Sequence, residues 1–167
     1  MKRIVLTGGG TAGHVTPNMA LIPRLLADGW DVHYIGAADS VEQGLIARIP
    51  GVTFHAIAVG KLRRYFDWKN FTDPFRVIKG VFQAQGVIRK LKPNVVFSKG
   101  GFVSVPVVYG AKANGVPVVI HESDMTPGLA NRLSAPFAKV ECCTFPEAVE
   151  HAHGKGVYTG TPIRPEI

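Results

Sequence analysis

The sequence has no apolar run that approaches the roughly 20 residues a membrane-spanning helix needs. It has only two cysteines, Cys142 and Cys143, and because they are adjacent they cannot form a disulfide scaffold. The first apolar run, Ile4–Leu6, is too short for the core of a secretion signal. The chain is not poor in hydrophobic residues, which make up 46% of it, and this content excludes a disordered chain. We therefore expect a soluble, cytoplasmic domain.

The excess of positive charge lies in one part of the chain. The 167 residues contain 19 Lys and Arg against 12 Asp and Glu, a net charge of +7. The segment from Lys61 to Lys92 holds nine basic and two acidic residues, so it accounts for the whole excess. Several aromatic residues, among them Phe66 and Trp68, lie in the same segment. A basic, aromatic segment on a neutral body indicates a local anionic surface as partner.

Short apolar segments of β-branched residues alternate with segments of helical spacing. We predict strands over Arg3–Thr7, Asp31–Gly36, Thr53–Val59, Asn94–Ser98, Val116–His121 and Val140–Thr144. We predict helices over Pro17–Ala27, Ser40–Arg48, Asp73–Leu91, Val105–Asn114 and Gly128–Ser134, with Ser40 and Asp73 as N-caps. This alternation predicts an α/β fold, a Rossmann-like parallel sheet with helices on both faces.

A glycine-rich loop, Gly8–His14, follows the first predicted strand and leads into a helix. Its backbone amides and the helix N-terminus suit a phosphate or another anion, although a tight turn without a ligand would have the same sequence. Gly8, Gly10 and Gly13 also match the G-x-G-x-x-G pattern of dinucleotide-binding proteins. The acidic residue that such proteins use to bind the ribose could only be Asp39, which comes later after the second predicted strand than the pattern requires. A nicotinamide-dependent oxidoreductase is therefore the alternative rather than the first interpretation.

His14 lies where this loop enters the helix, and the helix dipole there should lower the pKa of its imidazole. A neutral histidine next to a bound hydroxyl can act as a general base. A histidine that only caps or hydrogen-bonds the loop fits the position equally well.

Two further segments follow predicted strands. Ser98–Ser104 contains a second glycine turn, with Ser104 as the expected N-cap, and two such loops at one sheet edge suit a pyrophosphate-bearing ligand. Packing geometry alone would explain either loop. In the segment His121–Asp124, Glu122 and Asp124 could accept hydrogen bonds from sugar or peptide groups, or could cap the next helix. No second His or Cys lies nearby at ligand spacing, so we predict no metal site.

Four motifs occur in the order found in one known family. They are Gly8–Val15 (GGGTAGHV), Gly100–Pro106 (GGFVSVP), His121–Asp124 (HESD) with Gly128–Asn131 (GLAN), and Gly160–Arg164 (GTPIR). On these motifs the whole chain resembles the MurG family, the bacterial peptidoglycan N-acetylglucosaminyltransferases. Phe102 stands where some members have Tyr, and Ser123-Asp124 stands where some have Gln-Asn.

The resemblance implies the N-terminal half of a GT-B glycosyltransferase. Residues 1–160 would form the acceptor- and membrane-binding domain, and 161–167 the start of a linker to a C-terminal donor domain that the chain lacks. The complete enzyme would transfer GlcNAc from UDP-GlcNAc to the C4 hydroxyl of MurNAc in lipid I, giving lipid II with inversion; the fragment alone would be inactive. UDP-GlcNAc would be the donor substrate, with no tightly bound cofactor. The partners implied are lipid I, the anionic inner leaflet of the cell membrane and the missing domain, with no nucleic acid.

The resemblance also assigns roles to individual residues. It implies His14 and Glu122 as catalytic residues. It implies Thr11, Ala12, Gly13, Asp124 and Arg164 on the donor side. On the side of the acceptor and its pyrophosphate it implies Gly10, Gly100, Gly101, Phe102, Ser104 and Asn131.

The basic, aromatic segment is the expected membrane patch. Its members are Lys61, Arg63, Arg64, Phe66, Trp68, Lys69, Phe71, Phe75, Arg76, Lys79 and Phe82. Phe75, Ile78 and Phe82 fall on one helix face, which could instead pack on the sheet. A nucleic-acid-binding module is a further alternative, although the segment contains no recognised nucleic-acid motif.

Overall fold

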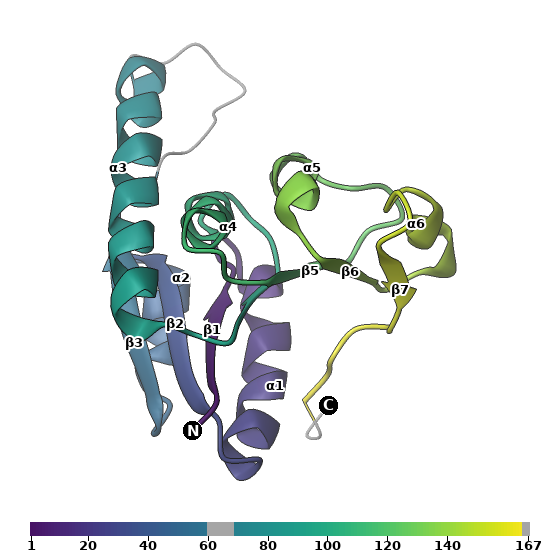
Figure 1. The fold of residues 1–167 in the computed structure, drawn as a ribbon, viewed down its shortest axis with the longest axis horizontal. Helices are drawn as coiled ribbons and strands as arrows, with labels where there is room; N and C mark the ends of the chain where they lie inside the picture. The colour runs from purple at the N-terminus through teal and green to yellow at the C-terminus, as the bar shows by residue number, and fades with distance from the viewer. Residues whose placement is uncertain (60–68, 165–167) are drawn as a thin grey trace.

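The computed structural model describes residues 1–59 and 69–164, and only the backbone of residues 69–73. Within these residues, seven strands form one parallel sheet in the order β3-β2-β1-β4-β5-β6-β7 (Figure 1). The strands are β1 (Arg3–Thr7), β2 (Asp31–Ala37), β3 (Val52–Ile57), β4 (Val95–Ser98), β5 (Val118–Glu122), β6 (Val140–Cys143) and β7 (Gly156–Tyr158). The helices are α1 (Thr16–Ala27), α2 (Val41–Ile46), α3 (Lys69–Leu91), α4 (Ser104–Ala113), α5 (Leu129–Ser134) and α6 (Pro146–Glu150), with 3-10 turns η1 (Ala12–His14) and η2 (Ala135–Phe137).

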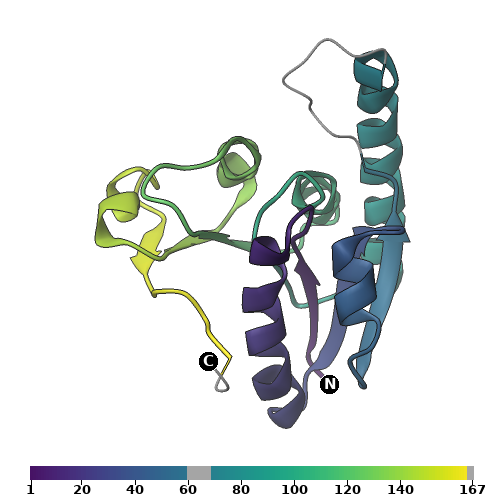
Figure 2. The ribbon, with the colours of Figure 1, turned by 180° about the vertical axis from the view of Figure 1, so that it is seen from behind.

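Helices cover both faces of the sheet, as predicted (Figures 1 and 2). Alternate residues of β1 point to opposite faces, so Leu6 packs with Ile22 of α1, and Val5 packs with Ile88 of α3. All four side chains are fully buried, and burying each stabilises the fold by about 1.5–3 kcal/mol. The fold-class prediction is therefore confirmed, with α1 and α2 on one face and α3 and α4 on the other.

Some predicted helix starts are wrong. The helix α3 begins at Lys69, so Asp73 is not its N-cap and Pro74 lies inside it. The boundary was misplaced because proline disfavours helix for the residue before it, yet near a helix N-terminus it removes only one backbone hydrogen bond. Ser104 is the first residue of α4 rather than its cap, and its hydroxyl donates to the carbonyl of Gly101 at 2.6 Å. Ser40 does cap α2, because its Oγ accepts from the amide of Gln43 at 3.2 Å.

The sequence reading also missed α6 and β7. Both are short, with five and three residues, and Val157 and Tyr158 of the edge strand β7 are exposed. Neither element therefore has a clear apolar periodicity. Cys142 and Cys143 are free thiols in β6; Cys143 is buried and Cys142 is partly exposed.

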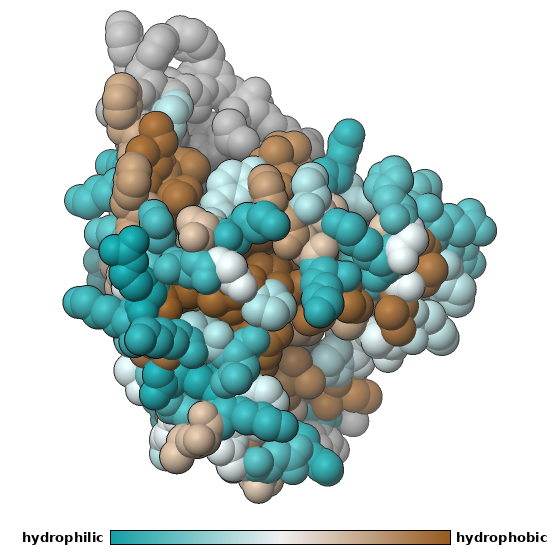
Figure 3. Space-filling view, viewed as in Figure 1, coloured by the Kyte–Doolittle hydropathy of each residue, from teal (hydrophilic) through white to brown (hydrophobic). Residues whose placement is uncertain are grey.

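Among the described side chains of the long helix α3, those of its C-terminal part pack on the sheet. Gly80 lies so close to the end of β3 that a Cβ there would be 2.2 Å from the carbonyl oxygen of Ala58. Farther along, Ala84 and Ile88 are fully buried. By contrast, Phe75, Ile78 and Phe82 are 74%, 53% and 68% exposed, and Figure 3 shows hydrophobic surface over this part of α3. The alternative that this apolar face packs on the sheet is therefore wrong.

Two glycines of α3 test this packing. Gly80→Ala should destabilise the fold by about 2 kcal/mol or more, because α3 must move away from Ala58 to accommodate the new methyl group. Gly86→Ala, where a Cβ would meet nothing within 4 Å, should stabilise the same helix by up to about 1 kcal/mol. Urea unfolding followed by circular dichroism measures both changes, and two variants with equal stability would contradict the packing described.

Candidate functional site

The two glycine loops lie on either side of the point where the strand order reverses. The chain runs from β1 outward to β2 and β3, then crosses to β4 on the other side of β1. The connections after β1 and β4 therefore leave in opposite directions, and such a divergence opens a crevice at the carboxyl ends of the strands. Residues 8–14 form the loop after β1, and residues 99–103 form the loop after β4.

The two loops contact each other directly. The amide of Gly9 donates to the carbonyl of Gly100 at 3.3 Å. Gly101 has φ +84, and a Cβ there would lie 2.1 Å from the carbonyl oxygen of Gly9 and 3.3 Å from Nδ1 of His14. Only a residue without a side chain allows this approach. Packing therefore requires these glycines, whether or not a ligand binds.

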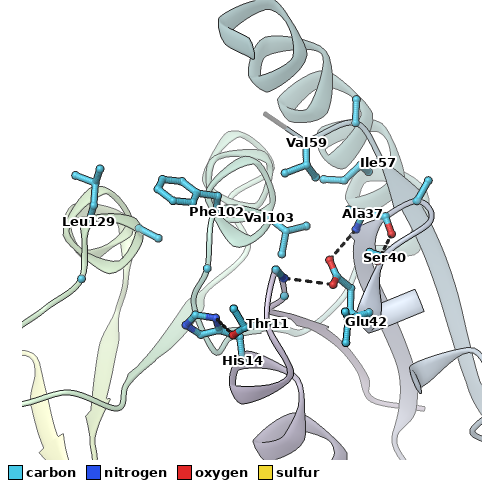
Figure 4. A pocket seen from close by; sticks show the side chains of 18 of the residues that line it. Thr11, His14, Ala37, Ser40, Glu42, Ile57, Val59, Phe102, Val103 and Leu129 are labelled. Atoms are coloured by element: carbon cyan, nitrogen blue, oxygen red, sulfur yellow. Dashed lines mark hydrogen bonds between the residues drawn. The ribbon is translucent and has the colours of Figure 1, made fainter. Parts of the chain in front are cut away.

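A cleft of about 1230 Å³ lies above the loops (Figure 4). Its walls come from both glycine loops, the segments after β2, β3 and β5, and α3 and α5; Phe102 and Leu129 face Ile57 and Val59 across it (Figure 4). Of the predicted site residues, the cleft brings together Gly10, Thr11, His14, Gly101, Phe102, Glu122, Asp124 and Asn131. Among the described residues, those predicted for the site but outside this lining are Ala12, Gly13, Gly100, Ser104 and Arg164. Ser104 is buried under α4, and Arg164 is exposed in the C-terminal tail.

Glu42, which the sequence analysis missed, occupies part of the first glycine loop. Its side chain is only 1% exposed, and its two carboxylate oxygens accept from the amides of Gly10 and Ala37, both at 3.3 Å (Figure 4). A Cβ on Gly9 would lie 2.3 Å from Glu42 Oε1. The amide of Gly10 is therefore already paired with a carboxylate. The position of Glu42 in the first turn after a strand end was the signal that could have identified it.

His14 is half-buried at the floor of the cleft. Its Nδ1 lies 3.0 Å from Oγ1 of Thr11, which leaves Nε2 as the nitrogen for proton transfer (Figure 4). Burial lowers the pKa of His14, and the charge of Lys99 lowers it further, against the opposing charges of Glu122 and Asp124. The predicted direction of this pKa shift is confirmed, but its main cause differs from the expected one. His14 ends the turn η1 and α1 begins at Thr16, so burial, rather than the helix dipole, is the largest contribution.

Glu122 organises the segment after β5. It is 3% exposed; Oε1 accepts from the amide of Asp124 at 2.9 Å, and Oε2 accepts from the amide of Gly128 at 3.3 Å and from Nδ2 of Asn131 at 2.9 Å. This is the capping arrangement that the sequence left open, and a catalytic role for Glu122 stays a prediction. The other amide atom of Asn131, Oδ1, is buried without a hydrogen-bond partner among the described residues. Because such an atom costs about 1–3 kcal/mol, it is a candidate acceptor for an N–H or O–H of a ligand.

Lys99 is a buried cation at the start of the second glycine loop, and the sequence analysis gave it no role. Its side chain is 2% exposed, and its Nζ donates to Oγ of Ser123. Burial lowers the pKa of Lys99, while the charges of Glu122 and Asp124 raise it. The lysine stands between the end of a strand and a glycine turn, and this context was the available signal.

Within the described part of the chain, no group of three or more His, Cys, Asp or Glu could hold a metal ion. Over the same residues, no helix is long and apolar enough to cross a membrane.

The parallel sheet and the cleft at its strand-order reversal define a Rossmann-like ligand-binding domain. The chain belongs to glycosyltransferase family 28, because the family model described as "Glycosyltransferase family 28 N-terminal domain" matches residues 4–142. A curated relative from Geobacillus thermodenitrificans is 60% identical over 99% of the chain and 47% of its own length. Another from Clostridium tetani is 61% identical over 99% of the chain and 46% of its own length. Both are named UDP-N-acetylglucosamine--N-acetylmuramyl-(pentapeptide) pyrophosphoryl-undecaprenol N-acetylglucosamine transferase.

Solved structures agree with this family. The crystal structure of Acinetobacter baumannii MurG matches with a TM-score of 0.81 and 27% identity, over 99% of the chain and 47% of that protein. The glycosyltransferase SsfS6 of Streptomyces sp. SF2575 matches with a TM-score of 0.63 at 15% identity, over 91% of the chain and 53% of that protein, which shows the fold alone. The resemblance to the MurG family is confirmed, and the oxidoreductase and nucleic-acid alternatives are not favoured. The chain spans about half the length of the curated relatives it matches.

The arrangement of Lys99 and His14 predicts a coupled titration. The folded-state pKa of His14 lies below the unfolded value of roughly 6.5, so the stability that neutral His14 contributes is present above that pH and is lost as the pH falls toward the lowered pKa. Lys99→Met should raise the pKa of His14, because it removes a positive charge that lowers it. NMR titration of the imidazole measures this shift, with exposed Lys112→Met as the matched control. A His14 pKa that both variants leave unchanged would contradict the coupling.

Proposed function

We propose that the chain is the N-terminal half of an inverting glycosyltransferase of peptidoglycan synthesis. The complete enzyme transfers GlcNAc from UDP-GlcNAc to the C4 hydroxyl of MurNAc in undecaprenyl-pyrophosphoryl-MurNAc-pentapeptide. One observation carries the proposal: 60% identity over 99% of the chain to a relative named for this transfer. In this proposal residues 1–160 form the acceptor domain, and residues 161–167 begin the linker to a C-terminal domain that binds most of the donor.

The cleft supplies groups for the acceptor half of this reaction. Neutral His14, with Nδ1 engaged by Thr11, takes the proton of the C4 hydroxyl on Nε2. The hydroxyl oxygen then attacks C1 of GlcNAc from the face opposite the departing UDP, which inverts that carbon. The bond from C1 to the phosphate oxygen breaks, and UDP leaves with the bonding electrons. The unpartnered Oδ1 of Asn131 accepts a hydrogen bond from a hydroxyl or acetamido N–H of a sugar.

The donor side needs groups from both halves of the enzyme. Among the described residues, no hydrogen bond occupies the amides of Thr11, Ala12 and Gly13, which stand ahead of α1. The amide of Thr11, which lines the cleft, supplies a donor for an anion there, and the amides of Ala12 and Gly13 follow it just outside the lining. Arg164 and Asp124 complete the donor side once the second domain is present, and no tightly bound cofactor takes part.

Substitution of His14 tests this mechanism in the complete enzyme. His14→Gln should lower kcat for GlcNAc transfer about 100-fold or more, because it removes the general base. The free energy of unfolding should change little, and exposed His151→Gln should keep full turnover. Unchanged turnover in His14→Gln would contradict the base assignment, and efficient transfer by residues 1–167 alone would contradict the half-enzyme proposal.

We infer that the domain binds peripherally to the cytoplasmic face of the cell membrane through α3. Support comes from the exposed Phe75, Ile78 and Phe82, whose side chains can enter the interfacial region of a bilayer. Of the other predicted patch residues, Lys61, Arg63, Arg64, Phe66 and Trp68 lie outside the described residues, and the side chains of Lys69 and Phe71 are not described.

Vesicle flotation tests this surface. Residues 1–167 should bind phosphatidylglycerol-containing vesicles in low salt, and Phe75→Ser with Phe82→Ser should weaken binding roughly tenfold or more, because two exposed apolar anchors are lost. Val157→Ser with Ile163→Ser is the matched control, since both residues are also exposed, Val157 in the edge strand β7 at the other end of the sheet from β3 and Ile163 in the tail that follows β7. Equal binding by both double variants would contradict the proposed membrane face.

A further inference from the structure

The charges that line the cleft are unevenly placed. Its described lining contains four carboxylates, Asp39, Glu42, Glu122 and Asp124, and two cations, Arg76 and Lys79. Both cations belong to α3, whereas the carboxylates come from the last residue of β5, from the segments after β2 and β5, and from α2. The sequence analysis had placed Arg76 and Lys79 in the membrane patch, but the structure brings both to the wall of the cleft.

Helix geometry explains how one helix serves two surfaces. The core face of α3 contains Gly80 and Ala84, and its exposed apolar face contains Phe75 and Phe82. At about 100° per residue, Arg76 and Lys79 fall on the flank between these two faces. The cations are therefore next to the apolar face but are turned toward the cleft, which agrees with their place in its lining.

The carboxylates restrict where an anion can lie. Glu42 already takes the amide of Gly10, which the sequence analysis had assigned to the acceptor pyrophosphate. A diphosphate close to Glu42 or Asp124 would meet a like charge, whereas beside Arg76 and Lys79 it meets two opposite charges. The most favourable position for a diphosphate in this cleft is therefore against α3.

We propose that Arg76 and Lys79 bind the diphosphate of the lipid-linked acceptor, as substrate-binding residues rather than as general membrane-facing charge. This inference rests on the proposed function, which supplies an acceptor in which a lipid chain, a diphosphate and a sugar follow one another. The structure has three surfaces in the same order as these three parts of the acceptor. The apolar face of α3 comes first, the two cations on its flank come next, and His14 lies on the floor of the same cleft.

The test uses the complete enzyme and a soluble acceptor with a short prenyl chain, without vesicles. Arg76→Gln with Lys79→Gln should raise the KM for this acceptor roughly tenfold or more, because two charge-assisted contacts to phosphate are lost. The kcat and the KM for UDP-GlcNAc should stay within about twofold, as for a group that binds only the acceptor. Arg89→Gln with Lys90→Gln is the matched control; it removes the same charge from exposed positions in the last turn of α3 and should leave all three constants unchanged.

Two other kinetic results overturn the inference. An acceptor KM that changes only when vesicles are present would assign the cations to lipid headgroups. A raised KM for UDP-GlcNAc alone would assign them to the donor.

Equilibrium binding of the same acceptor without donor separates this inference from the proposed function. A wild-type enzyme that binds the acceptor through these cations but transfers nothing contradicts the proposed function alone, and equal acceptor affinity in wild type and Arg76→Gln/Lys79→Gln contradicts this inference alone.

Discussion

The contact between Gly9 and Gly101 is the constraint on which the cleft depends. Two loops from neighbouring strands meet backbone to backbone, and a methyl group on Gly101 would overlap the carbonyl of Gly9. Because nothing separates the loops, His14 and Thr11 on one loop and Phe102 on the other line the same cavity. The strand order places this contact at the reversal point of the sheet, where connections diverge and leave room for a ligand.

Buried charges hold the surroundings of this contact in place. Glu42 connects the first glycine loop to the end of β2, and Glu122 connects β5 to the start of α5. Lys99, the first residue of the loop after β4, donates to Ser123. Much of the charge near the cleft is thus used to position backbone, and buried charges are tolerated only when they are paired in this way. Among the described residues, the groups left for a ligand include the amide of Thr11, His14 Nε2, Asn131 Oδ1 and the two cations of α3.

The sequence predicted most of this architecture from strong local signals. Apolar β-branched strands and glycine turns located β1 to β6 within a few residues, and the strand ends identified His14 and Glu122, whereas Asn131 was identified by the resemblance to the MurG family. The sequence did not identify residues whose role depends on contacts between distant parts of the chain. Glu42 and Lys99 acquire their roles only when β1 lies between β2 and β4, a strand order that residue spacing does not reveal. The start of α3 was misplaced because a proline preference was weighted above the helix that surrounds Pro74.

The two touching glycine loops and the adjacent flank of α3 together form the proposed acceptor site. This arrangement can be tested by mapping the backbone amide chemical shifts of residues 1–167 during titration with the short-prenyl soluble acceptor. We expect saturable shifts at residues 10–14, 101–103 and 76–79, with the β7 edge unaffected. Shifts confined to the far end of the sheet, or no change in either glycine loop at saturating acceptor, would contradict it.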